Sequence, residues 1–393
     1  MRKAKRFDPG IILVGVIVVI VFSVAVFLYF QVRTDPVSEY IEAQKIIPVA
    51  LIISDGDKIV VSELVLYHPS THRSAVIDVP PNTSVLIESE EKFDRIDALF
   101  QPGKLERYLK TMEDLLGTEI PFYINIPIEE LKNFISILGG IEIFIATPIE
   151  QISEENIVLL PSGRNTLDGT KTTMFLTYTD EADTEAEIIG RKQKFVQALL
   201  KEIGEQAIMI GKKNVFSVLS RYFSSNLNKQ ALLSLFEAYA SLDPDLSTLM
   251  RTLGATRNVG DTALLFPHRD AAIIKETTTQ AINSLSAVDE VGNVGSAIVL
   301  EILNGTGISG LASRTAQLYQ SYGYDVDIVG NADSDDFDKT LIFDRTGNIG
   351  LAQKAASVIN CQRIETDIYL ENTGGIDVTI ILGKDFDERT IKN

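Results

Sequence analysis

Hydrophobic residues form one uninterrupted segment near the start of the chain, residues 11–30. Sixteen of these twenty residues are Ile, Leu, Val or Phe, and none is charged. A helix of this length rises about 30 Å, which is the thickness of the hydrocarbon core of a bilayer. Gly15 and Ser23 do not make the segment amphipathic, which disfavours a buried core helix. The pattern therefore predicts a transmembrane helix.

The charges on either side of this segment predict its orientation. Four basic residues precede it: Arg2, Lys3, Lys5 and Arg6. After it come Arg33 and three acidic residues before the next lysine. Because basic flanks stay in the cytoplasm, we expect residues 1–10 to form a cytoplasmic tail and the chain after residue 30 to lie outside the cell. A cleaved signal peptide is the alternative, but the segment ends FLYFQVRTDP, without a small-residue cleavage pattern.

Beyond a polar stalk at residues 31–46, strand-like runs alternate with segments of helical periodicity. Val49–Ile53 is one of the apolar runs typical of strands. Residues 104–116 and 128–138 have apolar positions at helical spacing, and a glycine ends each of them. Strands alternating with helices predict an α/β domain, which we assign to residues 47–285, including a helical extension at its end.

The last hundred residues predict a second, smaller α/β unit at residues 297–386, after a linker at residues 286–296. Its runs follow the order β-α-β-β-α-β. Gly305-x-Gly307-x-x-Gly310 stands between the first strand and the first helix and matches a dinucleotide fingerprint. The unit is too short for a dinucleotide-binding domain, so we interpret these glycines as allowing a tight turn and close helix packing.

Composition and charge exclude several classes of function. The net charge is −18, and the +3 of residues 1–10 leaves −21 for the rest. So acidic a surface disfavours nucleic acid as a partner, because nucleic-acid binding depends on Lys and Arg. The single cysteine, Cys361, excludes an intramolecular disulfide, and we interpret it as a small buried apolar residue. The three histidines show no zinc-site spacing.

Several segments resemble the LytR–CpsA–Psr family. In the first domain they read FYINIPIEELKNFISILGGIEIFI, LPSGRNTLDGTKTTMFLTY and GRKQKFVQALLKEI. In the second, LEILNGTGISGLASRTAQLYQSYGYDVDIVGNA is similar to the C-terminal domain often joined to that family. The resemblance implies an anchored protein facing the cell wall, with an apolar groove for a polyprenyl chain. Family members transfer a glycopolymer from a polyprenyl pyrophosphate to peptidoglycan, usually with Mg²⁺.

The sequence departs from the family at most positions where the resemblance implies a charged site residue. Two arginines after the LDG loop are replaced by Thr177 and Thr179, and a third by Ile188. The family's Pro-Arg-Asp-Thr turn reads Pro80-Pro81-Asn82-Thr83. Only Arg191 and Gln193 remain in register, and the resemblance implies that they bind substrate. A developing pyrophosphate charge needs several fixed cations, so this set predicts a degenerate catalytic site.

The metal-binding aspartate of the family has two possible counterparts. Without a gap it aligns with Val60, and with a three-residue deletion Glu63 replaces it. An odd shift reverses the face to which a strand residue points, so the two alignments exclude each other. Asp55 and Asp57 are further candidate metal ligands, although Asp55-Gly56-Asp57 is also a typical turn.

We therefore expect a membrane-anchored, extracytoplasmic protein that binds a polyprenyl-linked glycopolymer or peptidoglycan without transferring it. The alternative is an active, divergent phosphotransferase that uses Arg191 as its catalytic cation, a carboxylate set drawn from Asp55, Asp57 and Glu63, and Mg²⁺. That alternative requires Arg191 and at least two carboxylates to converge at one groove. Arg191 could instead be a solvated helix residue paired with Glu187.

Overall fold

A computed structural model describes two units and part of the apolar segment. The described residues are 13–24, 35–87, 92–145, 148–152, 157–180, 183, 185–242, 247–260, 262–286, 298–346, 349–361, 363–367 and 375–386. Residues 13–24 are helical, whereas the rest of the apolar segment, the predicted tail and most of the predicted linker lie outside the described residues. Among the helices of the described part, none has the length and apolar character needed to cross a bilayer.

The first unit comprises the described residues from 35 to 286. Its strands are β1 Ile47–Asp55, β2 Lys58–Tyr67, β3 Ser74–Asp78, β4 Ser84–Ile87, β5 Lys92–Arg95, β6 Phe122–Pro127, β7 Ile141–Ile145, β8 Ile149–Ile152, β9 Ile157–Leu160, β10 Gly163–Leu167, β11 Ser224–Ser225, β12 Ser247–Arg251, β13 Gly254–Val259 and β14 Thr262–Pro267. Its helices are α2 Pro36–Glu42, the 3₁₀ helix η1 Ile96–Leu99, α3 Glu106–Leu116, α4 Ile128–Leu138, α5 Gly169–Thr177, α6 Glu185–Glu205, α7 Ala207–Ile210, α8 Lys213–Leu219, α9 Lys229–Tyr239 and α10 Ala272–Ser286.

The second unit comprises the described residues from 298 to 386. Its elements are β15 Val299–Asn304, α11 Leu311–Ser321, β16 Asp325–Asn331, β17 Leu341–Asp344, α12 Ile349–Val358, β18 Ile364–Thr366 and β19 Val378–Leu382. The predicted order β-α-β-β-α-β is therefore incomplete, because β18 stands between α12 and the last strand. A strand of three residues is too short to produce a recognisable apolar pattern.

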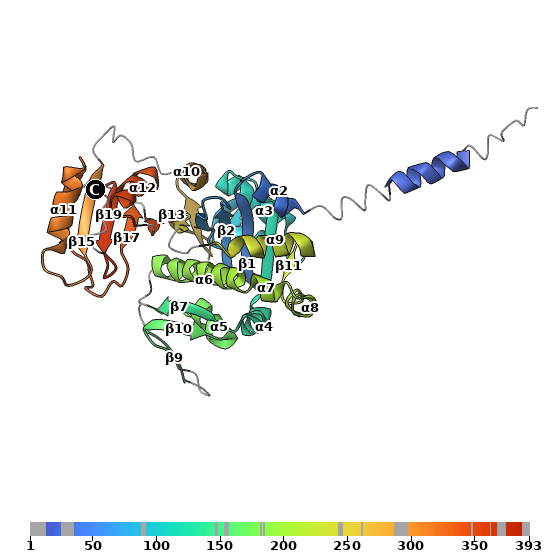
Figure 1. The fold of residues 1–393 in the computed structure, drawn as a ribbon, viewed down its shortest axis with the longest axis horizontal. Coiled ribbons are helices and arrows are strands. Elements are labelled where there is room, and N and C mark those ends of the chain that lie inside the picture. Colours follow the sequence, from blue (N-terminus) through green and yellow to red (C-terminus); the bar gives the residue numbers. More distant parts are fainter. Residues whose placement is uncertain are drawn as a thin grey trace, which may run out of the picture.

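One sheet runs through both units, in the order β11-β6-β1-β2-β3-β12-β18-β17-β19-β15-β16. Within the first unit, β1, β2 and β3 pair antiparallel, and β6 and β12 add as parallel neighbours at either side. The mixed sheet with helices on both faces confirms the predicted α/β class. The sequence did not predict that the second unit continues this sheet, and the units lie side by side (Figure 1).

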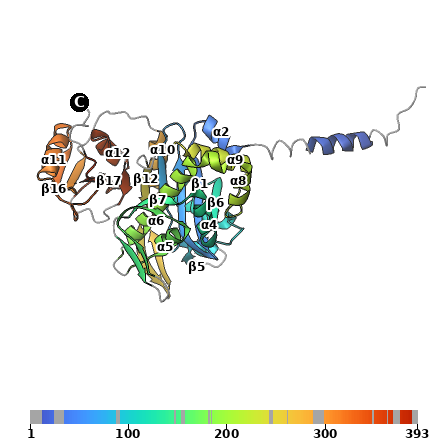
Figure 2. The ribbon, with the colours of Figure 1, turned by 60° about the horizontal axis from the view of Figure 1, so that its bottom comes forward.

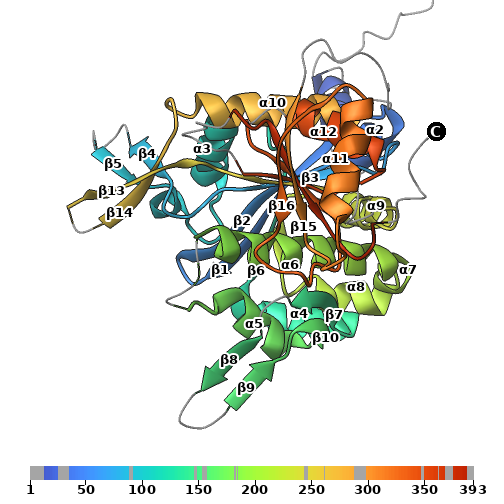
Figure 3. The ribbon, with the colours of Figure 1, turned by 90° about the vertical axis from the view of Figure 1, so that its left-hand side faces the viewer.

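Alternate strand residues of the first unit supply two separate cores. Leu51 and Ile53 pack in one core with residues of α4, α6 and α9, whereas Ala50 and Ile52 pack in the other with residues of α3 and α10. Figure 3 shows α3 and α10 on one side of the strands and α4 and α6 on the other. This period-two alternation explains why the central strands carry apolar residues on both faces.

Glycines end two helices where the sequence predicts that they should. Gly117 after α3 and Gly139 after α4 adopt left-handed conformations, with φ of 70° and 92°. Only glycine takes this conformation without steric cost, which is why both helices stop there. A third glycine, Gly204 near the end of α6, allows a close approach, because a Cβ there would lie 2.2 Å from the Tyr239 carbonyl oxygen at the end of α9.

Candidate functional site

Arg191, the cation that the resemblance assigns to the site, is bound by its own surroundings. Its Nη1 donates to the Tyr178 carbonyl at 2.6 Å, and its Nη2 lies 2.8 Å from Asp183 Oδ2. The guanidinium also lies over the Tyr178 ring, 5.3 Å from the ring centroid. The Arg191 side chain is only 12% exposed, so it is not the solvated residue considered from the sequence. These contacts connect α6 to Tyr178 and Asp183, which precede it in the chain.

Gln193 is buried and connects two strands of the sheet. Its Nε2 donates to the Val76 carbonyl at 3.1 Å and to the Met250 carbonyl at 2.7 Å, and these carbonyls belong to β3 and β12. Residues two positions apart on a helix point in different directions, so Gln193 and Arg191 do not face a common ligand. The contacts of Gln193 are those of a structural residue.

The carboxylates proposed as metal ligands do not converge. Asp55 and Asp57 are exposed at the turn between β1 and β2, whereas Glu63 is fully buried within β2 opposite Leu51. In the described part of the chain, no three His, Cys, Asp or Glu side chains group as metal ligands would. The set of Asp55, Asp57 and Glu63 is therefore not one site in this structure.

A bulge in β2 interrupts the regular alternation of its side chains between the two faces of the sheet. Ile53 pairs with Val61, but Ser54 pairs with Ile59, so Val60 is an extra residue in β2. Val60 packs against the core that contains α6, and Glu63 points to the same side, where it meets α6 residues. The premise of an unbroken alternation was therefore wrong, and the two alignments of the family aspartate do not exclude each other by strand face.

Glu63 and Asp78 form a buried acidic pair that the sequence did not reveal. They are direct partners across β2 and β3 and are 0% and 3% exposed. Burial, and then the neighbouring Asp78 carboxylate, raises the pKa of Glu63 well above its usual value. Burial raises the pKa of Asp78 to about 7, although the nearby Lys192 ammonium opposes this shift. Two adjacent ionised carboxylates repel each other and can only accept hydrogen bonds, so burial of the pair favours its protonation.

The acidic pair does not fit Mg²⁺. This cation requires near-octahedral oxygen ligands and usually keeps several waters. Glu63 and Asp78 lie inside the sheet–helix layer, and the α6 residue Lys192 already supplies a positive charge there; burial lowers the pKa of this lysine. A proton and a lysine can neutralise the pair, and both carboxyl residues are almost completely excluded from the solvent that would hydrate a metal ion.

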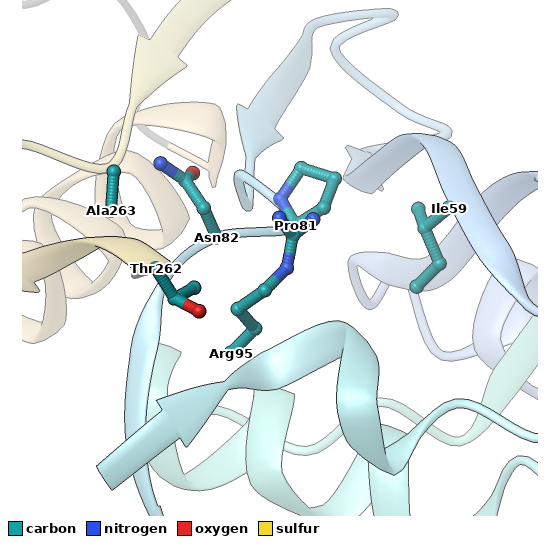
Figure 4. Close-up of a pocket in the computed structure, with 6 residues that line it drawn as sticks. All are labelled: Ile59, Pro81, Asn82, Arg95, Thr262 and Ala263. Atoms are coloured by element: carbon teal, nitrogen blue, oxygen red, sulfur yellow. The ribbon is translucent and has the colours of Figure 1, made fainter. Parts of the chain in front are cut away.

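An open pocket of about 550 Å³ lies at the turn that the resemblance assigns to the active site (Figure 4). Its described lining residues come from the start of β2, the turn before β4, the end of β5 and β14: Ile59, Pro81, Asn82, Arg95, Thr262 and Ala263. The volume is in the usual range for small-molecule sites. The lining combines apolar surface with three polar side chains.

Among the described lining residues the cation is Arg95, and sequence reasoning missed it. Its Nε and Nη2 bind Asp97 Oδ1 and Oδ2 at 2.8 and 2.6 Å, a bidentate pair. The Arg95 side chain remains 41% exposed. In the segment KFDRID this arginine belongs to no recognisable motif. Pairing of β5 with β4, with Arg95 opposite Ser84, brings it to the turn.

Family models match both units. The model described as the LytR_cpsA_psr family matches residues 55–283. The model described as LytR cell envelope-related transcriptional attenuator matches residues 297–386. The two matched ranges agree with the two stretches that carry the sequence resemblance.

Individual relatives agree with this assignment. The chain is 26% identical over 91 residues to the polyisoprenyl-teichoic acid–peptidoglycan teichoic acid transferase TagU of Bacillus licheniformis; the match covers 23% of this chain and 30% of that relative. The fold is similar to crystal structures of Bacillus subtilis TagV (TM-score 0.54, 14% identity, 61% of this chain and 98% of that chain) and of an Enterococcus faecalis transcriptional regulator (TM-score 0.53, 18% identity, 62% and 90%).

Proposed function

The chain belongs to the LytR_cpsA_psr family, and on this basis we propose that it binds a polyprenyl-linked glycopolymer, or peptidoglycan itself, at the cell envelope without transferring it. The similarity to a teichoic acid transferase supports a glycopolymer as the ligand class. The apolar segment at residues 11–30 and its basic flank support a single-pass anchor with both units on the outer side.

The charge of the pocket carries this proposal. Pro81 and Asn82 line it, and they replace the two charged residues of the family turn. Of the six described lining residues, only Arg95 is cationic, and its guanidinium is already paired with Asp97. One preorganised contact is typically worth a few kcal/mol in a transfer reaction, and several are needed together. A pocket with one shared cation can hold a phosphate but lacks the charges that stabilise a leaving pyrophosphate.

Binding of a polyprenyl phosphate to the full chain, purified in detergent, tests the proposal. We expect binding that does not depend on Mg²⁺ and that weakens about tenfold in Arg95→Gln, the loss of one charged hydrogen-bond partner. Arg164→Gln is the matched control, because this arginine is exposed and lies on β10. Absence of binding would overturn the proposal. Mg²⁺-dependent binding together with transfer of glycopolymer to peptidoglycan would establish the phosphotransferase alternative.

Anchoring has its own test. We expect the full chain to stay in the membrane fraction after alkaline extraction, and a chain lacking residues 1–34 to be released. In intact protoplasts, external protease should digest both units. Release of the full chain by alkali would contradict a spanning anchor.

A further inference from the structure

Helix α10 of the first unit contacts α12 of the second, and the strand at which the two units meet is β12. It pairs in parallel with β3 of the first unit and, on its other side, with β18 of the second, Thr248 opposite Ile364 and Leu249 opposite Glu365. The views in Figure 1 and Figure 2 both show the second unit beside the first. Without the second unit, β12 would be the edge of its sheet, with unpaired backbone groups.

In the part of the chain that the structure describes, the two units do not share a hydrophobic core. Among the described residues, each hydrophobic cluster belongs to a single unit: two lie before residue 286, and the third lies after residue 297. The strand pairing itself is short, with two registered residue pairs. Units of one chain move relative to each other unless their interface is large and hydrophobic. This interface therefore has the character of one that can open.

An ionic cluster closes the interface at the end of β12. Arg251 Nη2 is bound to Asp367 Oδ1, and Arg345 Nη1 donates to Asp367 Oδ2 at 2.5 Å. The two arginines belong to different units and are 16% and 8% exposed, whereas Asp367 is 39% exposed. Arg345 is fixed further by its Nε, which donates to Thr379 Oγ1 at 2.9 Å. One carboxylate from the second unit thus bridges a cation from each unit.

The same strand end is connected to the pocket of the first unit. Arg251 lies opposite Asp78 in the pairing of β12 with β3, and the next residue, Thr252, donates its hydroxyl to the Asp78 carbonyl at 2.7 Å. The chain continues from Asp78 directly to Pro81 and Asn82, which line the pocket. The end of β12 therefore contacts the strand that leads to the pocket turn.

We propose that the second unit is a reversible cap on strand β12, held in place by Asp367, which binds Arg251 of the first unit and Arg345 of the second. When the cap is closed, β18 pairs with Thr248 and Leu249 on the open side of β12, and Asp367 is paired with Arg251. When the cap is open, β12 becomes a free sheet edge and Arg251 loses its partner from the second unit.

Hydrogen–deuterium exchange of the full chain in detergent tests the cap. We expect Asp367→Asn to speed exchange of the peptides covering residues 247–251 and 363–367 about tenfold, because a charged hydrogen-bond partner of both arginines is lost. Peptides covering β1 and β15, one in each unit, should keep the wild-type rate, which shows that both units remain folded. In the wild type, raising salt from 50 to 500 mM should speed the same two peptides, and in Asp367→Asn it should not.

Two further variants keep the test decisive. Asp385→Asn is the matched control, because Asp385 binds Arg363 and Thr340 within the second unit. Arg251→Gln should reproduce the effect of Asp367→Asn, and the double variant should exchange no faster than either single one. The proposal would be overturned if the exchange rate of residues 247–251 were unchanged in Asp367→Asn. It would also be overturned if the exchange rate of the same residues 247–251 rose equally in Asp385→Asn.

Discussion

Glu63 on β2 and Asp78 on β3 lie directly opposite each other inside the first unit, and both are almost completely buried. The charged groups that act on Asp78 come from several elements: Glu63 on β2, Lys192 and Glu185 on α6, and Arg251 on β12. Burial raises the pKa of both carboxyls, so the folded chain holds a proton in this pair at a pH at which the unfolded chain has lost it.

This pair predicts that stability decreases as the pH rises. Folding raises the pKa of Asp78 from 3.8, the ordinary value of an aspartate, to about 7. A raised acid pKa contributes stability that is complete below pH 4 and is lost as the pH rises to about 7. As the pH rises from 5 to 8, we expect the free energy of unfolding of Asp78→Asn to increase by on the order of 2 kcal/mol relative to that of the wild type.

Calorimetric Tm values at several pH values measure this effect. The exposed Asp57→Asn is the control, and its Tm should follow that of the wild type across the range. If the Tm of Asp78→Asn and of the wild type change in parallel from pH 5 to pH 8, the pair does not hold a proton in the folded chain.

Arg191→Gln should affect stability rather than ligand binding. The substitution removes the contacts to Asp183 and to the Tyr178 carbonyl, which should destabilise the first unit by about 1–3 kcal/mol. Polyprenyl phosphate binding should change less than about twofold, because Arg191 is not among the described residues that line the pocket. Tm and affinity measured on one preparation separate the two effects. A large loss of affinity at unchanged Tm would identify Arg191 as a ligand-binding residue.

Asp97→Asn should strengthen phosphate binding. The Asp97 carboxylate accepts hydrogen bonds from two nitrogens of Arg95. An uncharged side chain at this position would leave the Arg95 guanidinium free to bind a phosphate in the pocket. We expect affinity for a polyprenyl phosphate to rise about threefold to tenfold, the scale of one charge-assisted contact. Titration of the full chain measures this. Asp114→Asn, which changes an exposed carboxylate on α3, should have no effect. Weaker binding in Asp97→Asn would show that Asp97 positions Arg95 for the ligand.

Two glycines of α6 should respond oppositely to alanine. At Gly204 a Cβ would lie 2.2 Å from the Tyr239 carbonyl oxygen, so Gly204→Ala should destabilise the α6–α9 contact by about 1–3 kcal/mol. At Gly190 a Cβ would meet nothing within 4 Å, so Gly190→Ala should stabilise the helix by about 0.5–1 kcal/mol. Thermal unfolding of both variants checks this. Equal Tm changes in the two variants would mean that α6 and α9 can move apart to accommodate the added methyl group without loss of stability.

Much of the local structure could be predicted from the sequence because its causes are local. The bounds of α4 were predicted to the residue, since the apolar spacing and the glycine that follows it lie within one short segment. Helix α3 begins two residues later than predicted and ends at the predicted residue, because no capping side chain marks its start. The predicted transmembrane helix and Mg²⁺ remain predictions.

The site depended on contacts that no local pattern contains. Arg95 reaches the pocket only because β5 folds back on β4, and Glu63 meets Asp78 only through strand pairing. The bulge at Val60 overturned an argument that was sound for a regular strand.

The sequence by itself determined the α/β class and the resemblance to the family, because apolar periodicity, glycine positions and motifs act over short distances. Only the tertiary structure decided that Arg191 is bound to Asp183, that the acidic pair is buried, and that β12 and β18 join the units in one sheet. The physical reason is that these outcomes depend on burial and on pairing between residues far apart in the chain. Charge and hydrogen-bond energies are decided by such neighbours.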